Sequence, residues 1–338
     1  MSASKANVLL VGGGAVGAIA ALNIEAGGLG AVTAVLRSNY PAVSQSGYNI
    51  ESVDHGKLPS WKPTKVVNSV PAASESEPYD YVVCVTKNCP DIKPTLVDLI
   101  TPAVTKGHTV IVLIQNGLNI ERPLFEAFPE NICLSGVSMI DSHEEEPGHI
   151  LHEEADLLHL GAFRNPNLSA EKEKEAALAF IKIYSAAGKT KCPYNEDVPF
   201  ARWRKLVFNS CLNPICAITG LDDARIRLAG AVEGLVKPAC EEIIKVAKAK
   251  GIELPEGIAD TMINLDPMDL YLKPSMQCDA EKGNYIEYEN LVGEPLRDAE
   301  KIGVSTPILK VVYELCKAMQ WKTMEAKGLV KVPPKRIL

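Results

Sequence analysis

The sequence lacks the features that mark several large classes of protein. No apolar run approaches the roughly 18 residues of a membrane-spanning helix, so we expect no membrane segment. Positive charge is not in excess, because 35 lysines and arginines stand against 42 acidic residues, a net charge of −7. This balance argues against general binding to nucleic acid or to an anionic membrane. A strand-like segment begins almost at the N-terminus, so we expect no signal or transit peptide.

Cysteine and histidine are present, but not in metal-binding patterns. The nine cysteines include no C-x-x-C pair, and the six histidines form no cluster with them. Cys84, Cys133, Cys211 and Cys216 all stand in apolar surroundings. We therefore expect free, buried thiols, no metal site and a reducing, cytoplasmic location.

A glycine-rich turn lies between the first strand-like and the first helix-like segment. The apolar run NVLLV leads directly into Gly12-Gly13-Gly14-Ala15-Val16-Gly17, and an alanine-rich segment of helical period follows. In this context G-x-G-x-x-G is typical of a dinucleotide-binding site. Gly12 allows the tight turn, Gly14 lets the backbone approach a pyrophosphate, and Gly17 lets the helix pack on the strand. Ala15 and Val16 begin the helix, whose free N–H groups suit phosphates.

The end of the second strand-like segment, AVTAVLR, indicates which dinucleotide binds. In an NAD site this strand usually ends in an acidic residue that binds the ribose hydroxyls. Here Arg37, Ser38 and Asn39 stand in that place, and a cation with small polar groups suits an additional 2′-phosphate. The sequence therefore favours NADPH, and the alternative is that Arg37 is an ordinary surface arginine.

The pattern of segments predicts two domains in this chain of 338 residues. The first half alternates strands with helices, which predicts an α/β domain with a Rossmann-type doubly wound parallel sheet. Residues 149–163 alternate like antiparallel edge strands, and Ser169 is a capping signal for a helix over 168–188. Strand-like sequence stops at Cys192, so we expect an NADPH-binding domain over 1–192 and an all-α substrate and catalytic domain over 193–338. The segments expected to be helical in the latter are 198–219, 226–250, 256–264, 281–302 and 306–327.

Two strands of the first domain end in polar residues at the edge where such sheets bind ligands. YDYVVCVTK ends with Lys87, and TVIVLIQNG ends with Asn116-Gly117. We expect Lys87 and Asn116 on the cofactor side, near the nicotinamide or its ribose. Taken singly, either residue could simply end its strand.

Polar residues recur in two otherwise apolar helical segments of the second domain. Lys205, Asn209 and Asn213 follow one another at four-residue spacing, which places them on one helical face. Buried there they would need partners, whereas the alternative is a solvated stripe with an extended lysine. Pro214 predicts a kink near Ser210.

A third polar set lies further along the chain. Ser275 precedes a helical segment, where capping would be its ordinary role. Glu287 is expected on a helix among apolar and aromatic neighbours, where a partly buried carboxylate would pair with a cation such as Lys205. The alternative is an exposed surface glutamate.

These constellations, in this order, resemble the 2-dehydropantoate 2-reductase (ketopantoate reductase) family over nearly the whole chain. The resemblance implies an NADPH-binding domain followed by a helical domain, with hydride transfer to a 2-keto acid. It implies that Lys205 is the general acid, that Glu287 acts beside it, and that Asn209, Asn213 and Ser275 bind the substrate. The matching motifs are GGGAVG at 12–17, QNG at 115–117, WRKLVFNSCLNP at 203–214, and SMQCD at 275–279 with a following IE at 286–287.

The chain departs from the family pattern where a small keto acid would bind. Before Ser275, where the family tends to have Asn and Ser, this chain has Leu272-Lys273-Pro274. Residues 138–142 read SMIDS in place of a Thr-His-rich strand end. After Glu287, Leu291-Val292-Gly293 replaces an ending of the Ile-Asn-Gly type. These changes leave three hypotheses: a ketopantoate reductase, a reductase of bulkier uncharged ketones such as cyclic diketones or keto lactones, and an NADPH-sensing regulator. The expected partner is a small ketone or 2-keto acid, and the expected state is a monomer or homodimer.

Overall fold

The computed structural model describes residues 5–75 and 77–336, which form two compact units. The first unit comprises the chain up to Asn88 together with Lys93–Asn116 and Ile120–Ala201. The second comprises Cys89–Ile92, Gly117–Asn119 and the chain from Arg202 onward. Two short loop segments of the N-terminal half therefore belong to the C-terminal unit.

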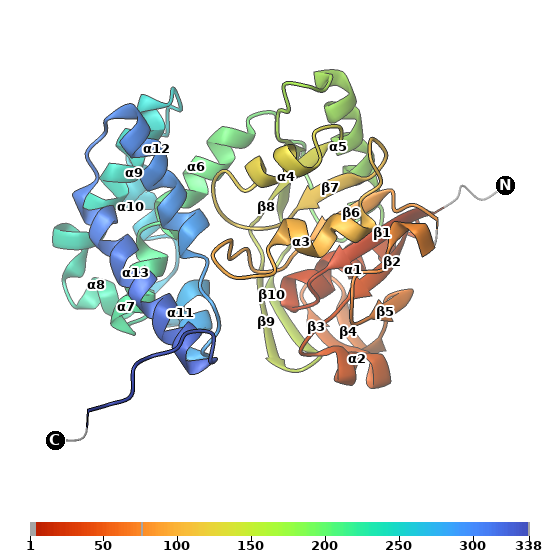
Figure 1. Ribbon diagram of the computed structural model, residues 1–338, viewed down its shortest axis with the longest axis horizontal. Helices are drawn as coiled ribbons and strands as arrows, with labels where there is room; N and C mark the ends of the chain where they lie inside the picture. The colour runs from red at the N-terminus through yellow and green to blue at the C-terminus, as the bar shows by residue number, and fades with distance from the viewer. Residues whose placement is uncertain (1–4, 76, 337–338) are drawn as a thin grey trace. The chain divides into compact units, whose positions relative to one another are not determined.

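A seven-stranded sheet forms the centre of the first unit within the described residues (Figure 1). Its strand order is β11–β8–β7–β6–β1–β2–β5, and all neighbours are parallel except β11 and β8. This confirms the predicted parallel sheet with an antiparallel strand at its edge. The strands are β1 Ala6–Val11, β2 Gly30–Val35, β5 Lys65–Val67, β6 Tyr81–Cys84, β7 Val110–Leu113, β8 Cys133–Ser138 and β11 Leu158–Ala162.

Helices cover both faces of this sheet, because alternate residues of its strands point in opposite directions. Val8 and Leu10 pack in one cluster with α1 (Ala15–Ala26) and α5 (Ala170–Tyr184). Leu9 and Val11 pack in another, which includes residues of α3 (Leu96–Ile100) and α4 (Arg122–Ala127). Burial on both faces explains why the strands are continuous apolar runs. Ser169 is the N-cap residue of α5, as predicted.

A second, four-stranded sheet packs against α1 and was not predicted. Its order is β4–β3–β10–β9, with β10 parallel to β3 and antiparallel to β9. Tyr48, Ile50 and Ile150 connect it to the cluster beneath α1. Of the edge strands expected over 149–163, β11 is at the edge of the main sheet, whereas β10 is an internal strand of the second sheet. The strands of the second sheet are β3 Tyr48–Ser52, β4 Gly56–Trp61, β9 Asp141–Glu146 and β10 His149–Glu154.

The second unit is helical in the part of the chain that the structure describes, which confirms the predicted class of this half. Its helix α6 begins in the last residues of the first unit. The helices are α6 Val198–Asn209, α7 Leu212–Thr219, α8 Asp223–Leu228, α9 Lys237–Ala249, α10 Ile258–Ile263, α11 Ser275–Glu281, α12 Glu294–Ile302 and α13 Pro307–Ala326, with π-helical turns η3 Val232–Val236 and η5 Glu289–Gly293.

Three predicted helices of this unit are wrong in their bounds. The helix expected over 226–250 is interrupted by a turn at Ala229-Gly230, where Gly230 has φ of +74°. The helix expected over 198–219 is broken at Ser210-Cys211, next to the kink predicted from Pro214. The helix expected to begin at Glu281 does not: Glu281 ends α11, and Gly283 leaves the helical region with φ of +66°. Regular structure resumes only after Glu287, so Glu287 lies in a connecting segment rather than on a helix.

The division between the units falls after Ala201, whereas the sequence predicts a boundary after Cys192. The intervening residues remain with the sheet because Lys191 and Tyr194 form isolated parallel bridges to Leu157 and Leu160 beside β11. Short pairings of this kind have no periodic signal in the sequence.

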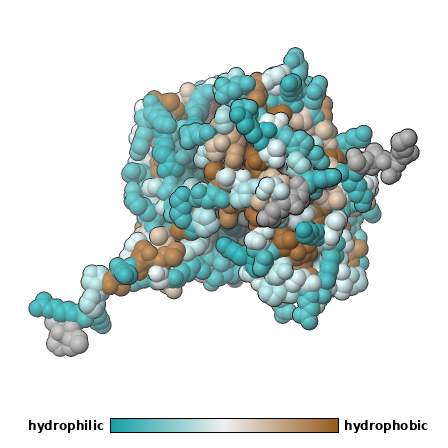
Figure 2. All heavy atoms as spheres, turned by 45° about the vertical axis from the view of Figure 1, so that its right-hand side comes forward, coloured by the Kyte–Doolittle hydropathy of each residue, from teal (hydrophilic) through white to brown (hydrophobic). Residues whose placement is uncertain are grey.

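The face in Figure 2 is mostly hydrophilic, with hydrophobic side chains in separate small areas. Across residues 5–75 and 77–336, none of the helices has the length and apolar character needed to span a membrane. All nine cysteines are free, and seven of them are buried.

Candidate functional site

The glycine turn and the ends of two strands meet at the carboxyl edge of the main sheet. β1 lies beside β6, and β6 beside β7, at the point where the strand order reverses. A Cβ on Gly12 would lie 2.6 Å from the backbone nitrogen of Thr86, just past the end of β6. Gln115, just past β7, donates from Nε2 to the carbonyl oxygen of Thr86 at 2.7 Å. This is the position at which open α/β sheets bind their ligands.

The effect of adding a side chain differs from one glycine of the turn to the next. Gly12 has φ of +107°, which favours glycine, and a Cβ on Gly17 would lie 1.8 Å from the carbonyl oxygen of Gly12. Gly13, a variable position of the motif, would clash with Leu36 at 1.9 Å. A Cβ on Gly14 would meet nothing nearer than 4.0 Å. The backbone is thus open at Gly14, where the motif requires close approach by a pyrophosphate.

The N-terminus of α1 follows this opening directly. Gly14 is its N-cap residue, and no side chain of the described residues caps its first N–H groups. The first turn also carries no acidic residue. A helix of twelve residues with uncapped N–H groups and a positive dipole end suits a phosphate group. The residues present therefore fit a dinucleotide, with Ala15 and Val16 at the expected place.

The residues after β2 differ in their availability for a ligand. Arg37 is exposed and forms no ion pair with any described residue, whereas Asn39 is buried. The Nδ2 group of Asn39 donates to the carbonyl oxygen of Gly13 at 2.7 Å and to Oε1 of Glu144 at 2.8 Å. Asn39 therefore supports the glycine turn, and Arg37 remains as the accessible cation beside it.

Lys87 and Asn116 lie close behind the strand ends. Lys87 is exposed and follows Thr86, while Asn116 is partly buried and follows Gln115. Since Gln115 and Thr86 are hydrogen-bonded, the two segments are neighbours. The predicted gathering of polar strand ends is present in the first unit, and the roles of the two residues stay predictions.

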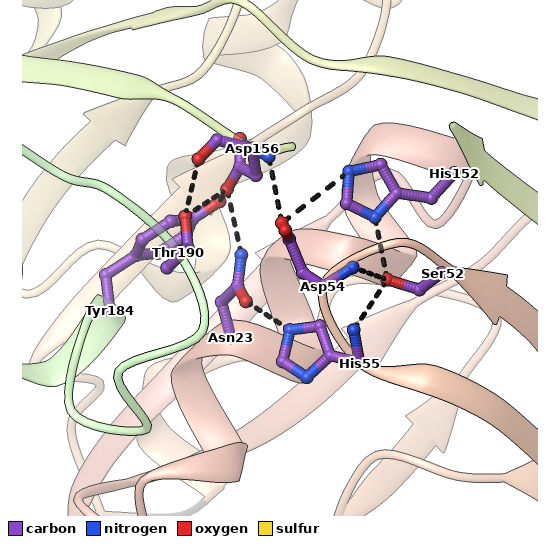
Figure 3. A network of polar contacts seen from close by, with 8 residues as sticks. All are labelled: Asn23, Ser52, Asp54, His55, His152, Asp156, Tyr184 and Thr190. Carbon is purple, nitrogen blue, oxygen red and sulfur yellow. Dashed lines mark hydrogen bonds and ion pairs between the residues drawn. The ribbon is translucent and has the colours of Figure 1, made fainter. Parts of the chain in front are cut away.

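A buried polar network anchors the other end of α1 (Figure 3). Asn23 donates from Nδ2 to Oδ2 of Asp156 at 2.9 Å, and this carboxylate also accepts from the hydroxyls of Tyr184 (2.7 Å) and Thr190 (2.9 Å). Burial raises the pKa of the Asp156 carboxyl. Because Tyr184 lies on α5, the network fixes the helix that carries the glycine turn against its neighbour.

Ser52, His152 and Asp54 in the same view have the residue types of a catalytic triad but not its geometry. Ser52 Oγ accepts from the backbone N–H groups of Asp54 and His55, so its own proton is donated to His152 Nδ1 at 2.8 Å. His152 Nε2 lies 3.9 Å from the Asp54 carboxylate, and His152 is only 2% exposed. We assign this group a structural role at the end of β3.

In the second unit, Lys205 lies on α6 among buried apolar neighbours. Trp203, Leu206 and Val207 are at most 2% exposed, while Lys205 itself is partly buried. Removal from water, with a further contribution from the positive charge of Arg202, lowers the pKa of Lys205 to about 8, against the opposing effect of Glu287. The charges of Lys205 and Glu287 therefore interact, as the sequence analysis proposed.

Side-chain bonds to the backbone hold the segment that carries Glu287. Gln320 of α13 binds both polar groups of Ile286: its Oε1 accepts from the N–H at 3.0 Å, and its Nε2 donates to the carbonyl oxygen at 3.3 Å. Ser210, at the break between α6 and α7, donates to the carbonyl oxygen of Leu291 in η5. These bonds connect the end of the lysine helix to the residues on either side of Glu287.

Asn213 and Ser275 are brought together at the start of α11. Asn213 Oδ1 accepts from the N–H of Met276 at 2.8 Å, and its Nδ2 donates to Ser275 Oγ at 3.3 Å. Asn213, at 1% exposed, thus caps α11 and orients the exposed Ser275. Asn209 lies one turn after Lys205 and is buried.

Sequence reasoning missed several residues that position these groups. Gly13 gave a weak signal as an additional glycine in the motif. Ser210 and Gln320 gave none, because their partners are backbone groups 81 and 34 residues away. Arg202 stands beside the recognised motif but carries no pattern of its own.

Comparisons with known proteins cover both units. The family model described as "Ketopantoate reductase PanE/ApbA" matches residues 8–165, and "Ketopantoate reductase PanE/ApbA C terminal" matches residues 197–320. A Saccharomyces cerevisiae protein described as uncharacterized is 34% identical over 350 residues, which cover 97% of each chain. A 2-dehydropantoate 2-reductase of Nostoc sp. is 25% identical over 309 residues, which cover 91% of this chain and 93% of the relative.

Solved structures have the same fold. The crystal structure of 2-dehydropantoate 2-reductase from Methylococcus capsulatus is 32% identical with a TM-score of 0.77, and it covers 94% of this chain and 97% of its own. A ternary structure of D-mandelate dehydrogenase with NADH and anilino(oxo)acetate has a TM-score of 0.78 at 23% identity, with 94% and 99% covered. The latter likeness concerns the fold alone.

Proposed function

The chain belongs to the ketopantoate reductase family of nicotinamide-dependent oxidoreductases acting on C=O or CH–OH groups, and we propose that it uses NADPH to reduce a 2-keto acid such as 2-dehydropantoate. The observation that carries the proposal is the environment of Lys205. A lysine with a pKa of about 8, held beside a buried carboxylate, is suited to proton transfer near neutral pH.

The proposed reaction divides its tasks between the two units. When bound at the glycine turn, the nicotinamide cofactor supplies the hydride. As hydride reaches the carbonyl carbon, negative charge develops on the oxygen, and a positioned donor lowers this barrier. Lys205 polarises that oxygen and delivers the proton from Nζ, while Glu287 holds the ammonium in place. Asn209 and Ser275 supply further hydrogen bonds to the substrate.

Arg37 supports NADPH over NADH. It is the exposed cation at the end of β2, where an NAD site usually has a carboxylate. The acidic residue that lies near the turn is Glu144, whose Oε2 defines the 4.0 Å approach to Gly14. If Glu144 instead bound ribose hydroxyls, NADH would be favoured. Glu144→Gln distinguishes these cases, because it should weaken NADH binding only if the carboxylate contacts the ribose.

The decisive test is removal of the proton donor. Lys205→Ala should lower kcat by about two to four orders of magnitude, with little change in NADPH affinity. Lys248→Ala, an exposed lysine of α9, is the matched control and should behave like the unmodified protein. Glu287→Gln should be milder if Glu287 only orients Lys205. A near-normal kcat in Lys205→Ala would refute the assignment.

A second substrate class is favoured by the residues before Ser275. The charge of Lys273 is neutralised by Glu281, because its Nζ forms an ion pair with that carboxylate at 2.7 Å. Pro274 is buried and offers no N–H donor. A site for a small anion needs donors for its carboxylate, and apolar neighbours penalise the anion more than a neutral ketone. An uncharged cyclic ketone or keto lactone is therefore the second candidate.

Direct competition separates the two substrate classes. Under identical NADPH, kcat/KM is measured for 2-dehydropantoate and for a panel of uncharged cyclic ketones and keto lactones. If the second candidate is right, the best uncharged substrate should match or exceed the keto acid in kcat/KM. A preference for 2-dehydropantoate above about a hundredfold, roughly 2.7 kcal/mol, would leave the keto acid as the substrate.

A further inference from the structure

A second cation is buried next to Lys205 on the same helix. Arg202 precedes Lys205 by three positions on α6, a spacing that places two side chains on neighbouring parts of one helical face. Its side chain is almost completely removed from solvent, at 4% exposed. The Nη1 group donates to the carbonyl oxygen of Gly117 at 2.8 Å, a buried bond that fixes the guanidinium.

The positive charges of Arg202 and Lys205 oppose each other. Like charges at this spacing repel each other, and both groups lose hydration on burial. Arginine stays charged under all ordinary conditions, so loss of the Lys205 proton relieves the repulsion between the two groups. Arg202, on the same helix, opposes the ammonium charge of Lys205, and Glu287, on the segment between α11 and η5, favours it.

We propose that Arg202 is a positioning residue that makes Lys205 a stronger proton donor by holding a permanent positive charge beside its ammonium. The bond to Gly117 keeps that charge in place, and Glu287 limits the effect by stabilising the ammonium. A cationic neighbour is one of the established ways in which proteins activate a lysine. The inference rests on the proposed function of Lys205 but concerns a different residue.

The proposal predicts a direct effect of Arg202 on the titration of Lys205. Removal of the neighbouring charge should raise the pKa of Lys205 by about one unit or more. The measurement is NMR titration of the protein with ¹³C-methylated lysines, in which Lys205→Arg identifies the signal of Lys205. It needs no substrate, so it remains informative if the ketone is not yet known.

Three variants separate charge from structure. Arg202→Gln removes the charge but keeps a donor for the Gly117 oxygen, and it should shift the Lys205 titration upward. Arg202→Lys keeps a positive charge and should restore most of the original midpoint. Arg204→Gln, on the same helix but not among the charges that act on Lys205, should leave the midpoint unchanged. Thermal melts check that each variant is folded.

The outcomes distinguish this inference from the proposed function. An unchanged Lys205 midpoint in folded Arg202→Gln overturns the role of Arg202, whatever the activity of Lys205→Ala. If Arg202→Gln does not fold, the midpoint in Arg202→Lys and in Arg202→Met decides instead: a shift in the methionine variant alone supports the proposal, and equal midpoints overturn it. A near-normal kcat in Lys205→Ala refutes the proton-donor role but not the measured influence of Arg202 on the lysine.

Discussion

Raising the pH from 7 to 9 should lower the rate of ketone reduction about tenfold. In the proposed mechanism Lys205 must carry a proton to act as the acid, and its pKa is about 8 rather than the 10.5 of an ordinary lysine. Its protonated fraction then falls from about nine-tenths at pH 7 to about one-tenth at pH 9. A lysine of ordinary pKa would stay protonated over this range, so the fall reports the buried environment.

The reverse reaction gives an independent check of the same group. In the proposed mechanism, oxidation of the alcohol product uses Lys205 as a base, so this rate should rise as the lysine loses its proton. The fall of the forward rate with pH and the rise of the reverse rate with pH should therefore share one midpoint, near pH 8. A pH effect on protein stability would lower both rates together and could not produce opposite slopes.

The assay is the change in NADPH absorbance between pH 6 and pH 10, with kcat/KM for the ketone as the measured quantity. This parameter reports the enzyme before it binds the ketone, the state closest to the structure. Lys205→Ala should retain a low rate without this transition. Forward rates that stay level up to pH 10, with Lys205 essential, would show that the lysine is not held at a lowered pKa.

Three further predictions concern the first unit. Arg37→Ala should raise the KM for NADPH by about ten- to a hundredfold (about 1.5–3 kcal/mol) and leave the KM for NADH unchanged, and equal use of both cofactors by the unmodified protein would contradict this. Gly14→Ala should keep the Tm but weaken NADPH binding at least about tenfold, whereas Gly17→Ala should lower the Tm itself, because its Cβ would lie 1.8 Å from a backbone oxygen. Tyr184→Phe should reduce the free energy of unfolding by about 1–3 kcal/mol in urea titrations, since it removes a bond to buried Asp156, and Tyr40→Phe is the control.

The parts of the fold that were predictable are those with local signals. The glycine turn needs three particular residues within six positions, and the parallel strands are apolar because helices cover both of their faces. In both cases the physical requirement acts on neighbours in sequence. The placement of Lys205 and Asn209 on one face was also predictable, because the two residues are one turn apart on the same helix.

The parts that were missed depend on contacts between distant segments. The second sheet pairs β3 with β10, about one hundred residues later, and alternation within a strand does not indicate which distant strand it pairs with. The apolar and aromatic neighbours of Glu287 favour a helix in the sequence analysis. Those neighbours are instead buried around a connecting segment that Gln320 holds by its backbone. No local pattern distinguishes these two cases.

Backbone partners around Lys205 have a consequence for its chemistry. Ser210, Asn213 and Gln320 form bonds to main-chain groups that neither titrate nor carry net charge. They can therefore fix the positions of Lys205 and Glu287 without altering the pH at which the lysine changes its charge. Loss of one of these bonds should lower the rate at every pH, whereas loss of the Arg202 charge should move the midpoint. The shape of the pH profile, rather than the size of the loss, separates the two kinds of positioning residue.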